Sequence, residues 1–254
     1  MSKGKIIIKT AEEIAVMKES GDILCACLDM LGQNCRPGIS TLELDKLAEE
    51  YIRDHGGVPT FKGYYGYPAS ACISINEEVV HGIPCKRKIR EGDIVSIDCG
   101  VTWKGFVSDS ARTFVVGTIP SEVQKLVDVT REALYLGIGA AQVGNCIRDI
   151  GLVVQQHCEK NGFSVVRDLV GHGVGREMHE PPQVPNYETS GKGPRLKPGM
   201  VIAIEPMINL GDYYVKQLAD GWTYVTLDGK PSAHFEHTVA ITENGPYILT
   251  NGLH

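Results

Sequence analysis

The sequence contains one internal repeat, and this repeat constrains the fold more than any other feature. Apolar residues on one face of a predicted helix over 44–56 recur 106 positions later, over 150–162, and both segments end in glycine. The strand-like stretch Arg90–Asp98 matches Lys197–Glu205 at an offset of 107, and both end in a carboxylate. A unit this long is no solenoid repeat. We therefore expect two similar αβ halves facing each other, with a chance likeness of two αβ units as the alternative.

Helix and strand signals follow the same order in each half. Capping boxes at Thr10–Glu13, Ser40–Glu43 and Ser121–Gln124 each predict the start of a helix. Short apolar runs at Ala71–Ile75 and Ile94–Cys99 predict strands. The pattern predicts an α+β fold, with antiparallel sheet and helices on the outer face. We expect residues 1–254 to form one domain, with its repeat at about 10–117 and 121–250.

Composition excludes several classes of protein. The net charge of −6 opposes a general nucleic-acid or anionic-membrane binder. No apolar run reaches the roughly 18 residues of a membrane span, and the apolar part of the N-terminal stretch 1–9 is too short for a signal peptide. Eight cysteines occur without a C-x-x-C pair, so we interpret most as free, buried thiols. The chain is expected to be cytoplasmic.

Two aspartates are predicted to project together from a hairpin. A two-residue turn at Lys104-Gly105 would place Asp109 opposite Gly100, which shares a strand face with Asp98. The aspartates would then be diagonal neighbours within apolar runs. Two carboxylates placed so repel each other and are costly to bury, which a cation would relieve. A solvated hairpin face is the alternative.

The second half supplies matching groups. Glu205 ends an apolar strand, and Glu236 precedes another in F-E-H-T-V-A-I. Four carboxylates from two symmetric halves suit a dinuclear site, and His172 in G-H-G-V-G-R would favour a transition metal over magnesium. His179 and His81 are further candidates, although a lone histidine is more often structural.

Taken together, these residues resemble the type I methionine aminopeptidases, which have the pita-bread fold. The matching stretches cover about Thr10 to Thr250 and include G-D-I-V-S-I-D, D-S-A-R-T-F, G-H-G-V-G-R-E-M-H-E-P-P and F-E-H-T. Only 26 residues separate His179 from Glu205, and 31 separate Glu205 from Glu236. These separations leave little room for the extra helical subdomain of the type II enzymes.

The resemblance implies a role for each site residue. Two divalent ions, of Co, Mn, Fe or Zn, would be held by Asp98, Asp109, His172, Glu205 and Glu236, with Asp109 and Glu236 bridging. The catalytic residues would be His81, His179 and Glu205. Metal-activated hydroxide would then attack the first peptide bond and remove methionine when the second residue is small.

The resemblance also implies a substrate pocket and partners. Beside His81 and His179, the methionine pocket would be lined by Phe61, Tyr64, Tyr67, Cys72, Met178 and Trp222. A monovalent cation would lie near Asn76 and Ser232. The implied substrates are nascent polypeptide N-termini, with a transient ribosome contact, no membrane or specific nucleic-acid partner, and a monomeric protein.

Three other interpretations stay open. Xaa-Pro or creatinase-type pita-bread peptidases share these motifs but carry a large N-terminal domain, for which Asp98 comes too early. A binding protein that has lost its metal would lack ligands, and none is missing. A nucleic-acid module conflicts with the net charge of −6.

Overall fold

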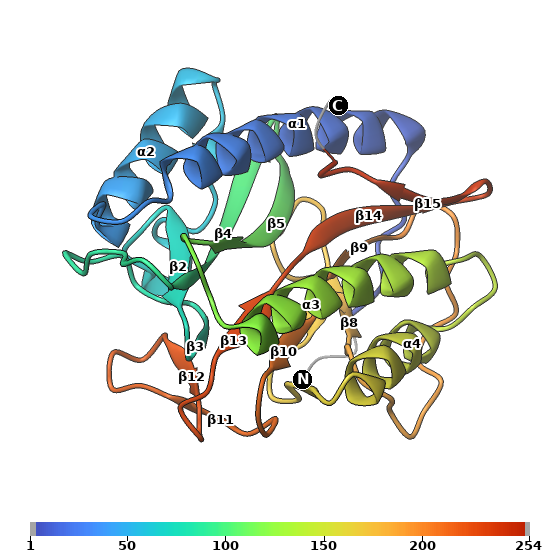
Figure 1. Cartoon of the computed structure of the whole chain (residues 1–254). Coiled ribbons are helices and arrows are strands. Elements are labelled where there is room, and N and C mark those ends of the chain that lie inside the picture. Colours follow the sequence, from blue (N-terminus) through green and yellow to red (C-terminus); the bar gives the residue numbers. More distant parts are fainter. Residues whose placement is uncertain (1–3, 252–254) are drawn as a thin grey trace.

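The computed structural model describes residues 4–251, in which four α-helices lie over antiparallel sheets (Figure 1). The helices are α1 (Ala11–Asn34), α2 (Thr41–Asp54), α3 (Ser121–Ala140) and α4 (Ile147–Lys160). The predicted α+β class is confirmed. Of the N-terminal stretch 1–9, the first three residues lie outside the described residues. None of the described helices is long and apolar enough to cross a membrane.

Two of the three predicted capping boxes are confirmed and one is wrong. Thr10 and Ser40 each accept the backbone N–H of the glutamate three residues on, and each glutamate accepts the N–H of its cap. Ser121 is instead the first residue of α3, and Pro120 is its N-cap. Because Ser121 already lies inside the helix, its hydroxyl is not at the capping position, and α3 begins without a side-chain cap bond.

Four sheets connect the helices. The first half contains β1 (Val58–Pro59), β2 (Ala71–Ile75), β4 (Ile94–Trp103) and β5 (Phe106–Val115), with β4 in the middle. The second half contains a five-stranded sheet of β7 (Gly171–Gly173), β8 (Glu180–Val184), β9 (Val201–Ile204), β14 (His237–Thr242) and β15 (Gly245–Ile248). Two small sheets join β6 (Ser164–Val165), β10 (Met207–Asn209) and β13 (Ser232–His234), and β3 (Glu78–Val80), β11 (Val215–Gln217) and β12 (Tyr224–Thr226).

The second helices of the two halves correspond closely in position and in the loops that precede them. Both ends of α2 and α4 are shifted by 106 residues. The loops before these helices have the same left-handed glycine, Gly38 at φ 93° and Gly144 at φ 92°. Each helix N-cap also forms an isolated antiparallel bridge, to Lys88 in one half and to Arg195 in the other. The sequence repeat is thus matched by equivalent backbone geometry.

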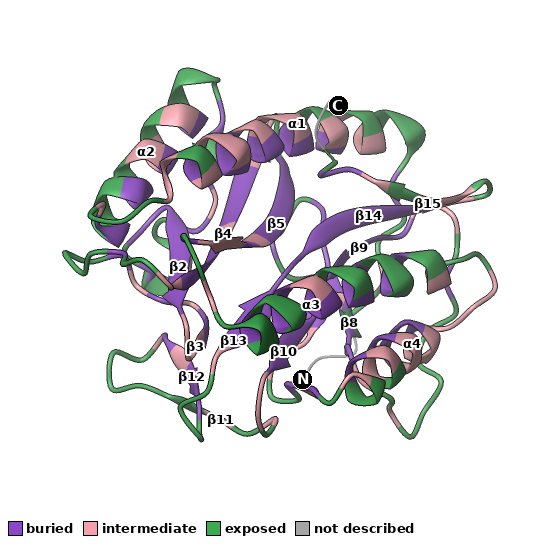
Figure 2. Cartoon of the chain, in the orientation of Figure 1, coloured by how far each residue is buried: buried purple, intermediate pink, exposed green. Residues whose placement is uncertain are grey.

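Each half has its own apolar core between its helices and its strands. Leu24, Leu28, Leu44, Ile52 and Ile97 belong to the first core, and Leu126, Leu134, Ile150, Val154 and Ile202 belong to the second. The helices expose one face to solvent, while the strands beneath them are buried (Figure 2). A third apolar cluster contains residues of both halves, among them Val107 of β5 and Val201 of β9.

Two threonines connect the halves along the seam between β5 and the β13–β14 segment. The Thr238 hydroxyl accepts the backbone N–H of Asp109 at 3.0 Å and donates to the Asp109 carbonyl at 2.8 Å. The Thr113 hydroxyl makes the same pair of contacts with His234, at 2.9 and 2.8 Å. Between them, the backbone N–H of Glu236 donates directly to the Ala111 carbonyl at 2.9 Å. The side chains replace backbone partners and hold the two strands apart.

The seam predicts an unequal effect of two similar substitutions. Thr238→Val keeps the side-chain shape but leaves a buried N–H and a buried carbonyl of Asp109 without this partner. We expect a loss of about 1–3 kcal/mol in the free energy of unfolding, measured by urea denaturation. The exposed Thr118→Val serves as the control and should change stability little. Equal stability of the two variants would contradict the role of the seam.

Candidate metal centre and substrate pocket

Five predicted ligands from separate elements line one cavity of about 190 Å³. Asp98 lies on β4, Asp109 on β5 and His172 on β7, whereas Glu205 directly follows β9 and Glu236 lies between β13 and β14. Both halves therefore contribute acidic groups. The cavity lies where the two halves meet.

The hairpin that holds the aspartates has the predicted register. β4 and β5 pair Gly100 with Asp109 and Asp98 with Ala111, and the turn residues Lys104 and Gly105 have φ of 48° and 79°. Gly100 is required by close packing, since a Cβ there would lie 2.7 Å from the ring of Phe61. The missing side chain brings an aromatic wall close to the aspartates.

The glutamates emerge together from the second half. β9 and β14 are antiparallel and pair Ile204 with His237, so Glu205 and Glu236 are the next residues at the same end of the two strands. A hydrogen bond from Ser110 Oγ to the Glu236 carbonyl, at 2.7 Å, ties this end to β5. The seam therefore sets the position of Glu236 against Asp109.

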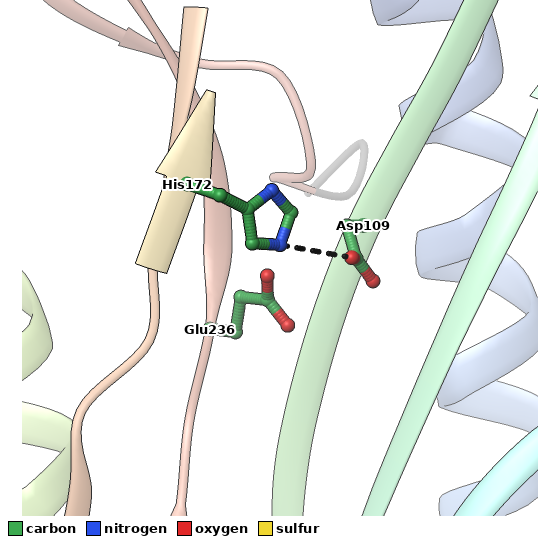
Figure 3. Close-up of side chains that lie close together, drawn as sticks. All are labelled: Asp109, His172 and Glu236. Carbon is green, nitrogen blue, oxygen red and sulfur yellow. Dashed lines mark ion pairs between the residues drawn. The ribbon is translucent and has the colours of Figure 1, made fainter. Parts of the chain in front are cut away.

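His172 presents one ring nitrogen to the carboxylates. Its Nδ1 lies 2.9 Å from the Gly173 carbonyl, which can only accept, so Nδ1 carries the proton. Nε2 is then unprotonated, 3.5 Å from Glu205 Oε1 and 3.8 Å from Asp109 Oδ2. Burial lowers the pKa of His172 to about 3, so the ring is neutral at pH 7. Figure 3 shows His172, Asp109 and Glu236 converging from three segments of the chain.

The carboxylates are electrostatically unfavourable without a positive partner. Burial, with added repulsion from neighbouring carboxylates, raises the pKa of Asp98, Glu205 and Glu236 well above normal. Burial likewise raises the pKa of Asp109 to about 7. Moreover, Asp98 Oδ1, Asp109 Oδ1 and Glu236 Oε1 are buried and have no hydrogen-bond partner among residues 4–251. Buried polar atoms are rarely left so.

These residues fit a divalent metal ion. Ligand atoms of Asp109, His172 and Glu236 all lie within 4.8 Å of one another. Several carboxylate oxygens with one unprotonated imidazole form a donor set for Mn, Fe, Co or Zn. Bound cations would compensate the repulsion and satisfy the unpartnered oxygens.

Contacts of the His179 ring and of the residue that follows it hold His179 at the edge of the cavity. Its Nδ1 lies 2.9 Å from the Tyr64 hydroxyl, and its ring centroid lies 4.3 Å from that of His172. The next residue, Glu180, forms a buried 2.5 Å ion pair with Lys9 and accepts the backbone N–H of Arg176 at 2.8 Å. A charge pair that links the N-terminal segment to this loop therefore stabilises the loop carrying His179.

The predicted pocket residues all line the same cavity. They are Phe61, Tyr64, Tyr67, Cys72, His81, Met178, His179 and Trp222. The Tyr67 ring meets the Trp222 ring edge to face at 5.0 Å, and the Tyr67 hydroxyl donates to the Gly82 carbonyl at 3.0 Å. Cys72 lies directly opposite Asp98 in the β2–β4 register. The apolar wall thus begins beside the acidic cluster.

Sequence reasoning missed part of the lining. Val80, Leu169, Val170 and Met207 also border the cavity, as does the exposed Tyr65. These apolar residues resemble core residues in the sequence, and only their place in the fold distinguishes them.

Asn76 and Ser232 lie together but do not line the cavity that the other predicted residues form. The backbone N–H of Ser232 donates to the Asn76 carbonyl at 2.8 Å. The Asn76 amide donates to Asp93 at 2.9 Å, and the Ser232 hydroxyl donates to the Ile208 carbonyl at 3.2 Å.

The chain is a member of a known class of metal-dependent peptidases. The model of metallopeptidase family M24 matches residues 15–243, most of the chain, and the chain belongs to that family. The expected pita-bread fold is confirmed by the likeness to solved structures of the family.

Individual relatives carry a more specific name. A methionine aminopeptidase of Clostridium perfringens is 57% identical over 245 residues, covering 96% of this chain and 98% of the relative. The crystal structure of methionine aminopeptidase from Thermotoga maritima is similar at a TM-score of 0.95 and 46% identity, covering 97% of this chain and all of that one (100%). The prolidase of Pyrococcus horikoshii matches with a TM-score of 0.77 and 23% identity over 97% of this chain and 64% of that one, a likeness of fold alone.

The raised pKa values predict how pH affects the metal-free protein. Since the folded pKa of Asp109 is about 7, against an ordinary value of 3.8, the folded state holds a proton that the unfolded state loses between these pH values. Stability in chelator should therefore fall as pH rises from about 4 to 7. Urea denaturation at pH 5 and pH 7.5 should reveal this fall, and added Mn²⁺ should reduce it. Glu236→Gln, which removes one of the repelling charges, should show a shallower fall. A pH-independent midpoint in chelator would contradict the raised pKa values of these buried carboxylates.

Proposed function

We propose that this chain removes the N-terminal methionine from peptides and nascent proteins when the second residue is small. One observation carries this proposal. A single cavity contains both an acidic cluster with a neutral histidine and an apolar pocket. Methionine aminopeptidases at 57% and 46% identity over nearly the whole chain support it.

In this proposal, two divalent ions would be held by Asp98, Asp109, His172, Glu205 and Glu236. Divalent ions bound there would supply an activated water at neutral pH and polarise the peptide carbonyl. The donor types restrict the proposed ions to Co, Mn, Fe or Zn.

Side chains of this protein would donate and accept the protons that move during the reaction. Burial lowers the pKa of His179, so it is neutral at pH 7. If the Tyr64 hydroxyl donates to Nδ1, then Nε2 carries the proton and can donate to the oxygen on which charge develops. His81, whose pKa burial lowers to about 4, would hold the nitrogen of the scissile bond. Glu205 would accept the proton of the attacking water and pass it to the leaving amine.

The pocket explains a preference for methionine. A cavity of about 190 Å³ is smaller than the ~300–1,000 Å³ of a drug-sized site, which suits one side chain beside the reacting groups. Aromatic rings and the Cys72 thiol offer soft, polarisable contacts to a thioether. The free N-terminal amine of the substrate would be neutralised by the acidic cluster.

The other interpretations are less well supported. The likeness to the prolidase, at 23% identity, extends to the fold but not to the activity. A binding protein without metal would not retain a buried acidic cluster whose oxygens have no partner in the described structure.

We further propose the domain organisation, oligomeric state and cellular location of this enzyme. Residues 1–254 would act as a single catalytic domain, monomeric, in the cytoplasm and in transient contact with the ribosome. A monovalent cation beside Asn76 and Ser232 stays a separate proposal.

The histidines should separate into two kinds. His172→Ala should lose metal affinity, because Nε2 faces the carboxylates. His179→Ala and His81→Ala should retain metal but lose about 10²-fold or more in kcat, the scale of one oxyanion donor. Metal content and single-turnover rate, measured on the same preparations, test this. Normal metal content in His172→Ala together with metal loss in His179→Ala would exchange the two assignments.

Four peptides test the function itself. Met-Ala-Ser should be cleaved, whereas Met-Arg-Ser and Leu-Ala-Ser should be cleaved slowly because of the large second residue and the branched first residue. Acetyl-Met-Ala-Ser should not be cleaved, because its amine no longer carries charge. Release of the first residue by metal-loaded protein is the measurement. Equal rates on the three free peptides would indicate a general aminopeptidase.

A further inference from the structure

The side chain of Tyr65 is placed in a way that the fold does not require. It lines the mouth of the cavity and is 85% exposed, the largest value among the exposed large hydrophobic side chains of residues 4–251. Of the aromatic rings in that part of the chain, Tyr64 alone is recorded in contact with it, edge to face at 4.6 Å. Ligand pockets are lined mainly by hydrophobic and aromatic side chains, so a ligand in the cavity would have this ring at its edge.

The backbone at Tyr65 is also strained. Its φ is 45°, in the left-handed region where a side chain other than glycine or asparagine is unfavourable. Gly63 and Gly66 on either side, both at φ 87°, adopt the same region without cost. Glycine would therefore suit position 65 better by local conformation, and its hydrogen-bonded turn would remain, since Gly66 N–H donates to Gly63 and Tyr67 N–H to Tyr64.

Successive ring contacts connect Tyr65 to the acidic cluster. The ring centroids of His172 and His179 are 4.3 Å apart, those of His179 and Tyr64 are 5.4 Å apart, and Tyr65 follows at 4.6 Å. An extended peptide advances about 3.3–3.6 Å per residue. If His179 contacts the first carbonyl of the substrate, Tyr65 is within reach of the third side chain.

We propose that Tyr65 is a specificity-determining residue that stacks against the third residue of the substrate. The ring would favour a flat or cationic third side chain, such as Phe or Arg, over Ser. This inference rests on the proposed function, because it needs a peptide held in the cavity by its N-terminal residue. The strained, exposed ring is retained for contact with the substrate rather than for stability.

The experiment compares cleavage of Met-Ala-Phe and Met-Ala-Ser by metal-loaded protein. The wild-type chain should prefer the Phe peptide about two- to tenfold in kcat/KM, the range of one aromatic contact. The difference should lie in KM, because this contact is remote from the reacting atoms. Tyr65→Gly should reduce the preference to about onefold, whereas Tyr65→Phe should retain it.

Lys104→Gly is the matched control. Lys104 also has a left-handed backbone, with φ 48°, but it is exposed on a hairpin turn away from the cavity, so the wild-type preference should persist. The same preference in Tyr65→Gly and wild type would overturn the proposal while leaving the function intact. Loss of preference in Tyr65→Phe would overturn stacking in favour of the hydroxyl. If the wild-type chain cleaved neither peptide, the proposed function would be overturned, and this inference with it.

Discussion

Four carboxylates buried in one cavity repel one another, and the rest of the structure depends on how this repulsion is relieved. Burial alone raises the pKa of such a group, and each neighbour raises it further. The neutral ring of His172 adds an electron pair rather than a positive charge. Divalent cations are the chemical partner that this set of groups requires. In the proposed function the same ions would supply an activated water, so the stability of the cavity and its chemistry would depend on the same ligands.

Beside the carboxylates, the two halves meet through hydroxyl groups. Each half buries an apolar core of its own, and a third apolar cluster, with Val107 of β5 and Val201 of β9, contains residues of both halves. Thr113 and Thr238 join the strands while keeping their backbones too far apart for a complete ladder. That spacing leaves room for Asp109 and Glu236 to face each other across the seam. Direct pairing along the whole seam would close the site.

Around this centre, the groups proposed to act on the substrate are held in place by neighbouring side chains. The Lys9–Glu180 ion pair holds the loop of His179, and the Tyr64 hydroxyl orients its ring. The absence of a side chain at Gly100 lets Phe61 approach the aspartates. Buried ion pairs rarely add stability overall, so the value of Lys9–Glu180 is best understood as positioning. A rigid site of this kind reduces reorganisation during the reaction.

The sequence by itself determined the repeat, the elements that it generates and the residues able to bind metal. Capping boxes, the Lys104-Gly105 turn and the alternation of strand residues act over a few positions, so the pairing of Gly100 with Asp109 followed from local rules. The predicted capping box at Ser121 is wrong because α3 begins one residue earlier, with Pro120 as an N-cap that has no side-chain acceptor. Tertiary structure alone decided that Met207 and Leu169 line the cavity, that Lys9 reaches Glu180, and that Thr238 bonds to Asp109. These contacts join residues far apart in the chain, and no local pattern encodes which distant groups will meet.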